Sequence, residues 1–215
     1  MTLKLYSYFR SSAAYRVSIA LNYKGLAYDT VPRSLLKPQE WTREYLSVNP
    51  QGLLPALADD GAVIAQSLAI IEYLEERHPE PALLPAEALA RAQVRAMALA
   101  VACDIHPLNN LRVLKQLRKL GQDEDGVADW YRHWITVGFA GLEVQARQHS
   151  SAHRHCFGDS VSVADLCLVP QLYNARRFNT DLDAFPTLVA IGEHLQRLPA
   201  FAAAHPDAQP DAPGL

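Results

Sequence analysis

The sequence is poor in cysteine. Its 215 residues include only three, Cys103, Cys156 and Cys167, and no two of them form a CxxC pair. An odd and scattered set of cysteines argues against a disulfide framework and against a zinc cluster, and it is typical of a reducing cytosol. We therefore expect a cytoplasmic protein that holds no metal.

Long apolar runs and an excess of positive charge are also missing. No apolar segment approaches a membrane span, and the N-terminus lacks the basic-then-apolar pattern of a secretion signal. The formal net charge is -3, which gives no electrostatic reason to expect nucleic acid or an anionic membrane as a partner. The hydrophobic content of 49% is ordinary for a soluble globular protein, and the length allows one or two domains.

The chain does contain a strand-to-helix turn with two serines. Leu3–Tyr6 alternates as a short strand does, and the mostly apolar residues 15–21 predict a helix that ends near Gly25. Ser11 and Ser12 lie between them, where the first N–H groups of a helix are unpaired and stabilise an anion. The hydroxyls either cap the helix or hydrogen-bond a bound thiolate, phosphate or carboxylate. Taken alone, the stretch favours capping.

More strand signals follow. Ala27–Val31 alternates and predicts a second strand, parallel to the first because a helix connects the two. Pro55 stands at the entrance of a third strand, so that Leu54 would present its backbone N–H and C=O to a peptide-like ligand at the sheet edge. Asp59–Gly61 is a turn signal and predicts a hairpin.

Two further polar positions are candidates for ligand contacts. Gln66 and Ser67 precede an apolar-periodic run, which places Ser67 as the N-cap of a helix. Taken alone, these two residues favour a helix cap. Considered together with the serine turn, they favour a ligand site in which the Gln66 amide, the Ser67 hydroxyl and the helix N–H groups hold a carboxylate. Gln39 lies in a polar, proline-bounded loop, where ligand contact and simple solvation are equally supported.

The second part of the chain is predicted to be helical. Prolines after residue 78 interrupt the pattern, so we expect a first domain at 1–80, a linker at 81–88 and a second domain at 89–215. Helices are expected at 88–120, locally disturbed by Pro107, and at 130–148, 163–176 and 187–198, followed by an irregular tail from His205.

Several side chains in these helices stand out. On a continuous helix, His106 and Asn110 would share a face and Arg112 would point elsewhere; a histidine satisfied by backbone groups at the kink is the alternative. Ser162 and Asp165 have the spacing of a capping box, for which we favour a structural role. Arg177 at a helix end either suits the dipole or faces a substrate carboxylate.

Five segments together resemble the zeta class of the glutathione transferases: Tyr6–Leu21, Asn49–Leu57, Gln66–Leu74, Asp104–Asn110 and Val163–Gln171. They occur in the same order and cover nearly the whole chain. The resemblance implies an α/β thioredoxin-like N-terminal domain, an all-α C-terminal domain, a glutathione site and a homodimer. It also implies a cis bond before Pro55 and a γ-glutamyl carboxylate at Gln66 and Ser67.

The resemblance and the chemistry of the residues together suggest a site. Catalytic roles fall to Ser11, Ser12 and His106. Glutathione contacts are expected from Ser11, Ser12, Ala13, Ala14, Gln39, Leu54, Pro55, Gln66, Ser67, His106 and Asn110. Substrate carboxylates are expected at Arg10, Arg112 and Arg177, since guanidinium binds a carboxylate bidentately.

Four activities are compared. A thioredoxin-like redox protein needs a cysteine at the strand-to-helix turn, and Ala13 stands where the zeta class often has one. A general conjugating transferase would want an apolar cleft without several arginines, and a non-catalytic glutathione-binding module would not need them. The preferred hypothesis is a glutathione-dependent cis–trans isomerase of an unsaturated oxo-dicarboxylic acid. The resemblance points to maleylacetoacetate, in aromatic amino-acid breakdown, with maleylpyruvate as the alternative.

Overall fold

The structure is a computed structural model that describes residues 3–34 and 43–213. The chain divides into two compact units, one made of Met1–Ala82 with Arg197–Leu215 and the other of Leu83–Gln196. The first boundary between the units, after Ala82, lies within the segment 81–88 that the sequence predicted to be a linker. The sequence placed residues 89–215 in one helical domain, whereas the segment from Arg197 onward groups with the first unit.

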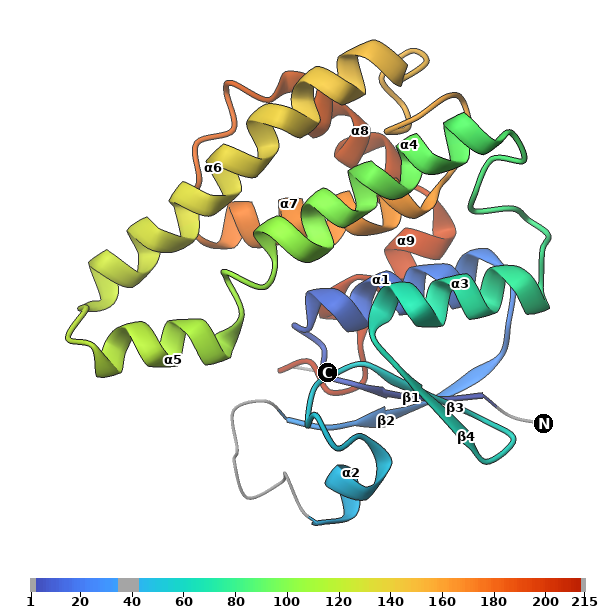
Figure 1. The fold of residues 1–215 in the computed structure, drawn as a ribbon, viewed down its shortest axis with the longest axis horizontal. Coiled ribbons are helices and arrows are strands. Elements are labelled where there is room, and N and C mark those ends of the chain that lie inside the picture. The colour runs from blue at the N-terminus through green and yellow to red at the C-terminus, as the bar shows by residue number, and fades with distance from the viewer. Residues whose placement is uncertain (1–2, 35–42, 214–215) are drawn as a thin grey trace. The chain divides into compact units, whose positions relative to one another are not determined.

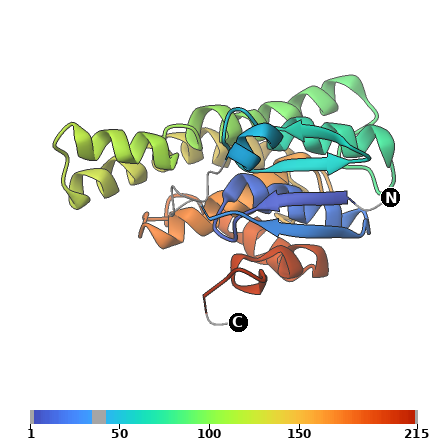
Figure 2. The same cartoon turned by 90° about the horizontal axis from the view of Figure 1, so that it is seen from below.

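The first unit contains a four-stranded sheet, whose strands are drawn as arrows in Figures 1 and 2. Its strands are β1 (Leu3–Ser7), β2 (Tyr28–Pro32), β3 (Ala56–Asp59) and β4 (Ala62–Ala65), in the spatial order β2-β1-β3-β4. β1 pairs with β2 in parallel, as the strand–helix–strand pattern predicted, and the other two pairings are antiparallel. The mixed sheet and its neighbouring helices are those of the thioredoxin-like domain expected from the sequence.

Helices α1 and α3 cover one face of this sheet (Figure 1). The helices of the unit are α1 (Ser12–Tyr23), α2 (Arg43–Val48), α3 (Ser67–Arg77), α9 (Pro199–Ala204) and a short 3-10 helix at Pro206–Ala208. Helix α9 packs on α1, where the Asn22 side-chain amide donates a hydrogen bond to the carbonyl of Ala200 at 3.2 Å. This packing explains why the C-terminal segment belongs to the first unit.

Backbone conformation confirms the predicted turns. Asp60 and Gly61, between β3 and β4, have φ of 49° and 85°. Two successive positive φ values are those of the type I′ turn that suits a two-residue hairpin. Gly25, just after α1, has φ of 65°, the left-handed conformation that commonly ends a helix.

Lys24 holds together the end of the first unit. Its ammonium group donates to Glu75 Oε2 at 2.7 Å, to the carbonyl of His78 at 2.7 Å and to that of Pro81 at 2.9 Å. The lysine and glutamate side chains are 0% and 7% exposed. The sequence suggested only that Lys24 suits the negative end of α1. It did not indicate the partners, because Glu75 on α3 and the two carbonyls after that helix lie 51 to 57 residues away.

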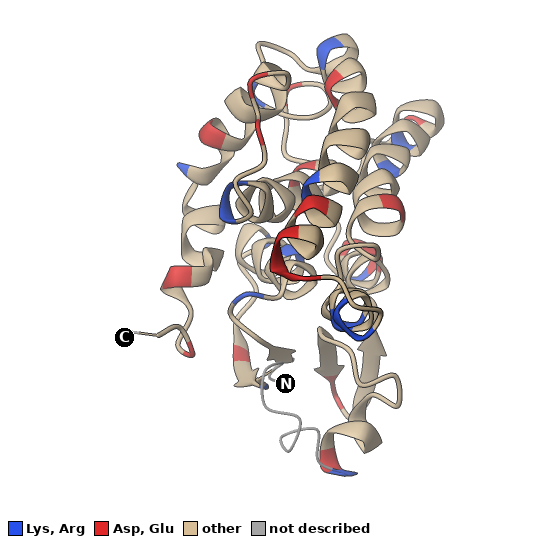
Figure 3. Cartoon of the chain, turned by 90° about the vertical axis from the view of Figure 1, so that its left-hand side faces the viewer, with Lys and Arg blue, Asp and Glu red and all other residues tan. Residues whose placement is uncertain are grey.

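The second unit is helical in all its regular elements. These are α4 (Ala88–Leu99), a π-helix at Ala100–Ile105, α5 (Leu111–Lys119), α6 (Glu124–His149), α7 (Val163–Arg177) and α8 (Pro186–Gln196). Helix α7 is buried along most of its length, and α4 and α8 pack on it. Lysine, arginine and acidic residues are interspersed along the helices of this unit (Figure 3). None of the helices within the described ranges combines the length and the apolar character needed to cross a membrane.

The helix expected at 88–120 with a local disturbance at Pro107 is instead two α-helices, separated by a π-helix and a turn. The N–H of His106 bonds to the carbonyl of Val101 at 2.9 Å, one residue further back than in an α-helix, and turns follow to residue 109. Pro107 has no N–H to donate and cannot continue the ladder. A new helix then begins after Asn110. The sequence located the disturbance correctly but not its extent.

The capping box at the start of α7 is confirmed. Asp165 Oδ2 accepts from the N–H of Ser162 at 2.7 Å, and Oδ1 accepts from the N–H of Cys156 at 2.7 Å. Burial raises the pKa of Asp165, and the two N–H donors act in the opposite direction. Asp165 therefore fixes both the first turn of α7 and the segment that precedes it.

We predict that Lys24→Met lowers the free energy of unfolding by about 3–5 kcal/mol, because it leaves the Glu75 carboxylate buried without its partner. Urea denaturation followed by circular dichroism measures the change. Arg118→Met is the control, since its ion pair with Glu124 is exposed and its loss should change stability little. Equal stability of the two variants would contradict a structural role for Lys24.

Candidate functional site

The sheet brings three of the predicted segments to one edge. Strand β3 runs antiparallel to both β1 and β4, so these two run in the same direction and their following helices begin at the same edge. Tyr6 pairs with Ala56, and Ala56 pairs with Ala65, which aligns the ends of the strands. The segments gathered at this edge are Ser11–Ser12, Leu54–Pro55 and Gln66–Ser67.

Ser11 is the N-cap of α1. Its backbone is extended, with φ of -76° and ψ of 108°, and its Oγ accepts from the N–H of Ala14 at 3.2 Å. Ser12 is the first helical residue, and both serines are buried. The capping interpretation is thus confirmed for Ser11. Because the cap occupies only an oxygen lone pair, the hydroxyl proton can still be donated to an anion.

The turn before Ser11 is held from two sides. The guanidinium of Arg10 lies 4.9 Å from the Phe9 ring centroid and donates to the hydroxyl of Tyr8 at 3.1 Å. The N–H of Phe9 donates to Asp211 Oδ2 at 3.1 Å. The tail that the sequence predicted to be irregular therefore fixes this turn. Nothing in the sequence pattern around Asp211 indicated so distant a partner.

Leu54 and Pro55 form a cis peptide bond, as the resemblance implied. The preceding carbonyl, that of Leu53, accepts from the Tyr45 hydroxyl and the Asn49 amide, both at 2.7 Å. Among residues 3–34 and 43–213, no partner is found for the backbone N–H or C=O of Leu54. Both groups are therefore available to an extended ligand.

Gln66, rather than Ser67, is the N-cap of α3, so the predicted cap is wrong by one residue. The carbonyl of Gln66 accepts from the N–H of Ile70 at 3.0 Å, which makes Ser67 the first helical residue. Gln66 has φ of 73°, an unfavourable value for a residue with a side chain. Its amide donates to Gln51 Oε1 at 2.9 Å and does not cap the helix. Strain of this kind is concentrated at functional sites.

The sequence did not identify Arg16 as part of this edge. Arg16 lies on α1 and is 2% exposed, and its Nη1 donates to Ser67 Oγ at 3.2 Å. An arginine in an amphipathic helix normally faces solvent, so no sequence pattern indicated that Arg16 is buried. The bond connects α1, one turn beyond its start, with the first residue of α3.

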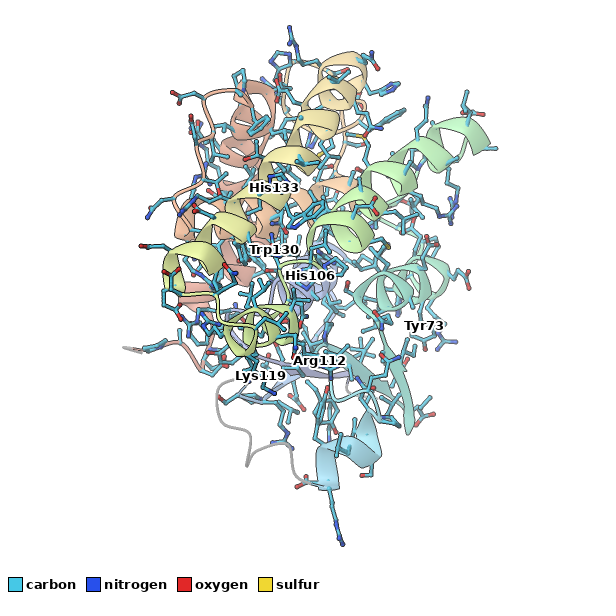
Figure 4. All side chains as sticks on the ribbon, turned by 60° about the vertical axis from the view of Figure 1, so that its left-hand side comes forward. Tyr73, His106, Arg112, Lys119, Trp130 and His133 are labelled. Atoms are coloured by element: carbon cyan, nitrogen blue, oxygen red, sulfur yellow. The ribbon has the colours of Figure 1, made fainter. Side chains whose placement is uncertain are left out.

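In the second unit, the predicted pairing of His106 and Asn110 on one helical face is wrong, because the chain between them is a turn. His106 is half-buried, and Asn110 caps α5 by accepting from the N–H of Arg112 at 3.0 Å. The indole N–H of Trp130 donates to the carbonyl of Leu108 at 2.9 Å and fixes this connection on α6. Figure 4 shows His106, Arg112 and Trp130 around it.

Arg177 ends α7 and is exposed, with its guanidinium 4.9 Å from the centroid of the Phe178 ring. Phe178 stacks on Tyr131 at a centroid distance of 3.6 Å. Burial raises the pKa of Tyr131 to about 12, with Arg177 acting in the opposite direction. Tyr131 therefore stays protonated near neutral pH, beside an arginine that is open to a ligand.

Gln39, a predicted glutathione contact, lies outside the described residues. Within them, no group of three or more His, Cys, Asp or Glu side chains is placed to hold a metal ion. None of the three cysteines forms a disulfide; Cys103 is exposed, and the other two are buried.

Comparison with known proteins identifies the fold. The family described as "Glutathione S-transferase, N-terminal domain" matches residues 5–82. A probable maleylacetoacetate isomerase of Vibrio cholerae is 49% identical, over 99% of both chains. The holo structure of a maleyl pyruvate isomerase, described as a bacterial zeta-class glutathione S-transferase, has a TM-score of 0.93 at 45% identity and covers 97% of this chain and 99% of its own.

A maleylacetoacetate isomerase from Anaeromyxobacter dehalogenans has been solved with two sets of ligands. The structure with glutathione in the active site has a TM-score of 0.89, and that with dicarboxyethyl glutathione and citrate has 0.87. Both are 45% identical and cover 99% of this chain and 98% of their own. With its mixed sheet and helical second unit, this chain belongs to the zeta class of the glutathione S-transferase family.

The cap on α5 gives a prediction. Asn110→Ala should lower the free energy of unfolding by about 1 kcal/mol, since an N-cap hydrogen bond is lost. Asn110→Asp should preserve stability, because aspartate caps equally well. Urea denaturation of both variants measures the difference. Destabilisation by the aspartate as large as that by alanine would show that the cap is not the stabilising contact.

Proposed function

We propose that this protein is a glutathione-dependent cis–trans isomerase that converts maleylacetoacetate to fumarylacetoacetate, in tyrosine and phenylalanine breakdown. The observation that carries the proposal is the edge where α1 and α3 begin, with the Ser11 hydroxyl, the Leu54 backbone and the strained Gln66 brought together. Relatives named maleylacetoacetate isomerase, 48% identical over 97–98% of this chain, support the same reaction.

The residues at this edge fit glutathione. The N–H and C=O of Leu54 match the backbone of its cysteinyl residue, as in strand addition. The first turn of α3, with Gln66 and Ser67, suits the γ-glutamyl carboxylate. Ser11 and Ser12 suit the sulfur. We assign supporting contacts to Ala13, Ala14, Pro55, Gln39, His106 and Asn110.

The residues of the chain contribute charge stabilisation and positioning. When bound, glutathione supplies a thiolate that adds to the cis double bond, permits rotation about the resulting single bond, and leaves again unchanged. The hydroxyl of Ser11 donates to the sulfur, and Ser12 and the α1 N-terminus add positive potential, which favours the charged form. His106 contacts glutathione or guides a proton.

Arginines suit the dicarboxylic substrate. Arg10, Arg112 and Arg177 each carry a planar guanidinium that binds a carboxylate through two parallel hydrogen bonds. The Arg10 guanidinium is already held against Phe9, and Arg177 is exposed at the end of α7. The dicarboxyethyl glutathione and citrate in the relative's active site support a preference for several carboxylates.

We also propose that the protein is a cytoplasmic homodimer. The family resemblance supports the dimer, and three cysteines that form no disulfide are consistent with a reducing compartment. Light scattering of the purified protein at several concentrations tests the assembly.

The reaction itself is tested by assaying maleylacetoacetate and maleylpyruvate side by side, with and without glutathione. We expect turnover only with glutathione and a higher kcat/KM for maleylacetoacetate. A preference for maleylpyruvate would support the alternative substrate. Conjugation of hydrophobic electrophiles without isomerisation of either acid would identify a general transferase, and binding without any turnover would identify a non-catalytic module.

Ser11→Ala should raise the pKa of bound glutathione by about 1–2 units, because a hydrogen bond to a charged group contributes roughly 1.5–3 kcal/mol. Turnover should fall, with little effect on saturation by the substrate. A pH titration of thiolate absorbance, run beside isomerase kinetics, measures both effects.

Ser11→Gly separates this role from the cap, because glycine at an N-cap costs only a few tenths of a kcal/mol. The glycine variant should be nearly as stable as the parent and as impaired in turnover as the alanine variant. Ser11 and Ser12 should also be replaced together, since one hydroxyl could substitute for the other. A double variant with the parental thiol pKa and turnover would reduce the turn to a helix cap.

Arg177→Ala should leave the bound thiol's pKa unchanged and raise KM for the substrate, if its contact is equally good in the ground and transition states. Arg176→Ala is the matched control, because Arg176 is the neighbouring exposed cation on the same helix end. Steady-state kinetics of the two variants measure the change in KM. A KM increase of equal size in both would show a general effect of charge and not a contact of Arg177.

A further inference from the structure

Arg16 is a buried cation for which the described residues provide no counterion. The residue is 2% exposed, and the one hydrogen bond that it makes within residues 3–34 and 43–213 runs from Nη1 to Ser67 Oγ at 3.2 Å. Nε and Nη2 are buried, and neither has a hydrogen-bond partner in that part of the chain. Within the described part of the chain, no carboxylate forms an ion pair with this guanidinium.

A buried guanidinium is energetically unfavourable unless a counter-charge or further hydrogen-bond acceptors surround it. Removing a charge from water is strongly unfavourable when neither a counter-charge nor a full set of hydrogen bonds replaces the solvent. Lys24, beyond the other end of the same helix, shows the usual solution, with a carboxylate and two carbonyls around its ammonium group. Among the described residues, Arg16 has no anion of this kind.

The arginine is directed at the N-terminus of α3. Ser67 is the first residue of this 11-residue helix, and the cap residue Gln66 provides no side-chain hydrogen bond to the first turn. The Ser67 oxygen accepts from Arg16, and its own proton meets no acceptor among the described residues. A negative ligand group at this helix end would accept a hydrogen bond from the Ser67 hydroxyl. It would also be stabilised by the positive charge of Arg16.

We infer that Arg16 is a positioning residue for a ligand carboxylate at the first turn of α3, acting through the Ser67 hydroxyl. The inference rests on the proposed function, in which the ligand is glutathione and the carboxylate is that of its γ-glutamyl residue. Arg16 orients the Ser67 proton toward the carboxylate and supplies buried positive charge. The carboxylate in turn provides the missing counter-charge.

The test compares two ligands that differ by this one group. Glutathione and 4-aminobutyryl-cysteinyl-glycine, which lacks the γ-glutamyl carboxylate, are titrated calorimetrically into the parent and into Arg16→Met. We expect the parent to prefer glutathione by roughly 10-fold or more, the loss typical of a charge-assisted contact. In Arg16→Met this preference should fall to less than about 3-fold, whereas affinity for the analogue should change little.

Three further variants make the result specific. Arg16→Lys keeps the charge and should restore part of the preference for glutathione. Ser67→Ala keeps the arginine but removes the hydroxyl, and should also reduce the preference. Lys24→Met removes the paired buried cation and should lower the melting temperature without changing the ratio of the two affinities. Circular dichroism of each variant without ligand verifies the fold.

An unchanged preference in folded Arg16→Met or in Ser67→Ala, or an equal loss of affinity for both ligands in Arg16→Met, would overturn the role of Arg16. A parent that binds both ligands equally would overturn it as well. These binding ratios are independent of turnover. A collapsed ratio in a protein that isomerises neither dicarboxylic acid would support Arg16 while refuting the proposed reaction.

Discussion

The structure depends on two helices that begin at one edge of a sheet. The register of β1, β3 and β4 aligns the starts of α1 and α3, and the bond from Arg16 to Ser67 connects the two helices. Each helix N-terminus favours negative charge. In the proposed complex, one start faces the thiolate of glutathione and the other its γ-glutamyl carboxylate, and the Leu54 backbone lies in the same set of strand ends.

The chemistry divides among groups with different physical roles. The Ser11 hydroxyl caps a helix, and in the proposed mechanism it also donates its proton to the glutathione sulfur. Stability and activation would then come from one residue. Ala13 supplies no thiol at the turn, which leaves bound glutathione as the source of the reactive sulfur. We propose that Arg10, Arg112 and Arg177 serve the substrate, because each offers a guanidinium for a carboxylate.

Local patterns predicted much of this structure. Alternation, an apolar helical run and Asp60–Gly61 were sufficient for the sheet and its hairpin, since these signals depend on neighbouring residues. The predictions failed where contacts between residues far apart in the sequence determine the structure. The last segment joins the first unit through packing of α9, and Gln66 replaces Ser67 as the cap because its strained backbone shifts the helix start. Arg16 was missed because no sequence pattern distinguishes a buried arginine from an exposed one.

The central claim is that glutathione acts as a returning nucleophile whose thiolate this protein stabilises. Nuclear magnetic resonance of a reaction with glutathione far below the substrate concentration tests it directly, by counting product and remaining free thiol together. We expect many product molecules per glutathione, full recovery of the thiol, and no turnover with S-methylglutathione. Consumption of one glutathione per product, or equal turnover with the S-methyl compound, would contradict it.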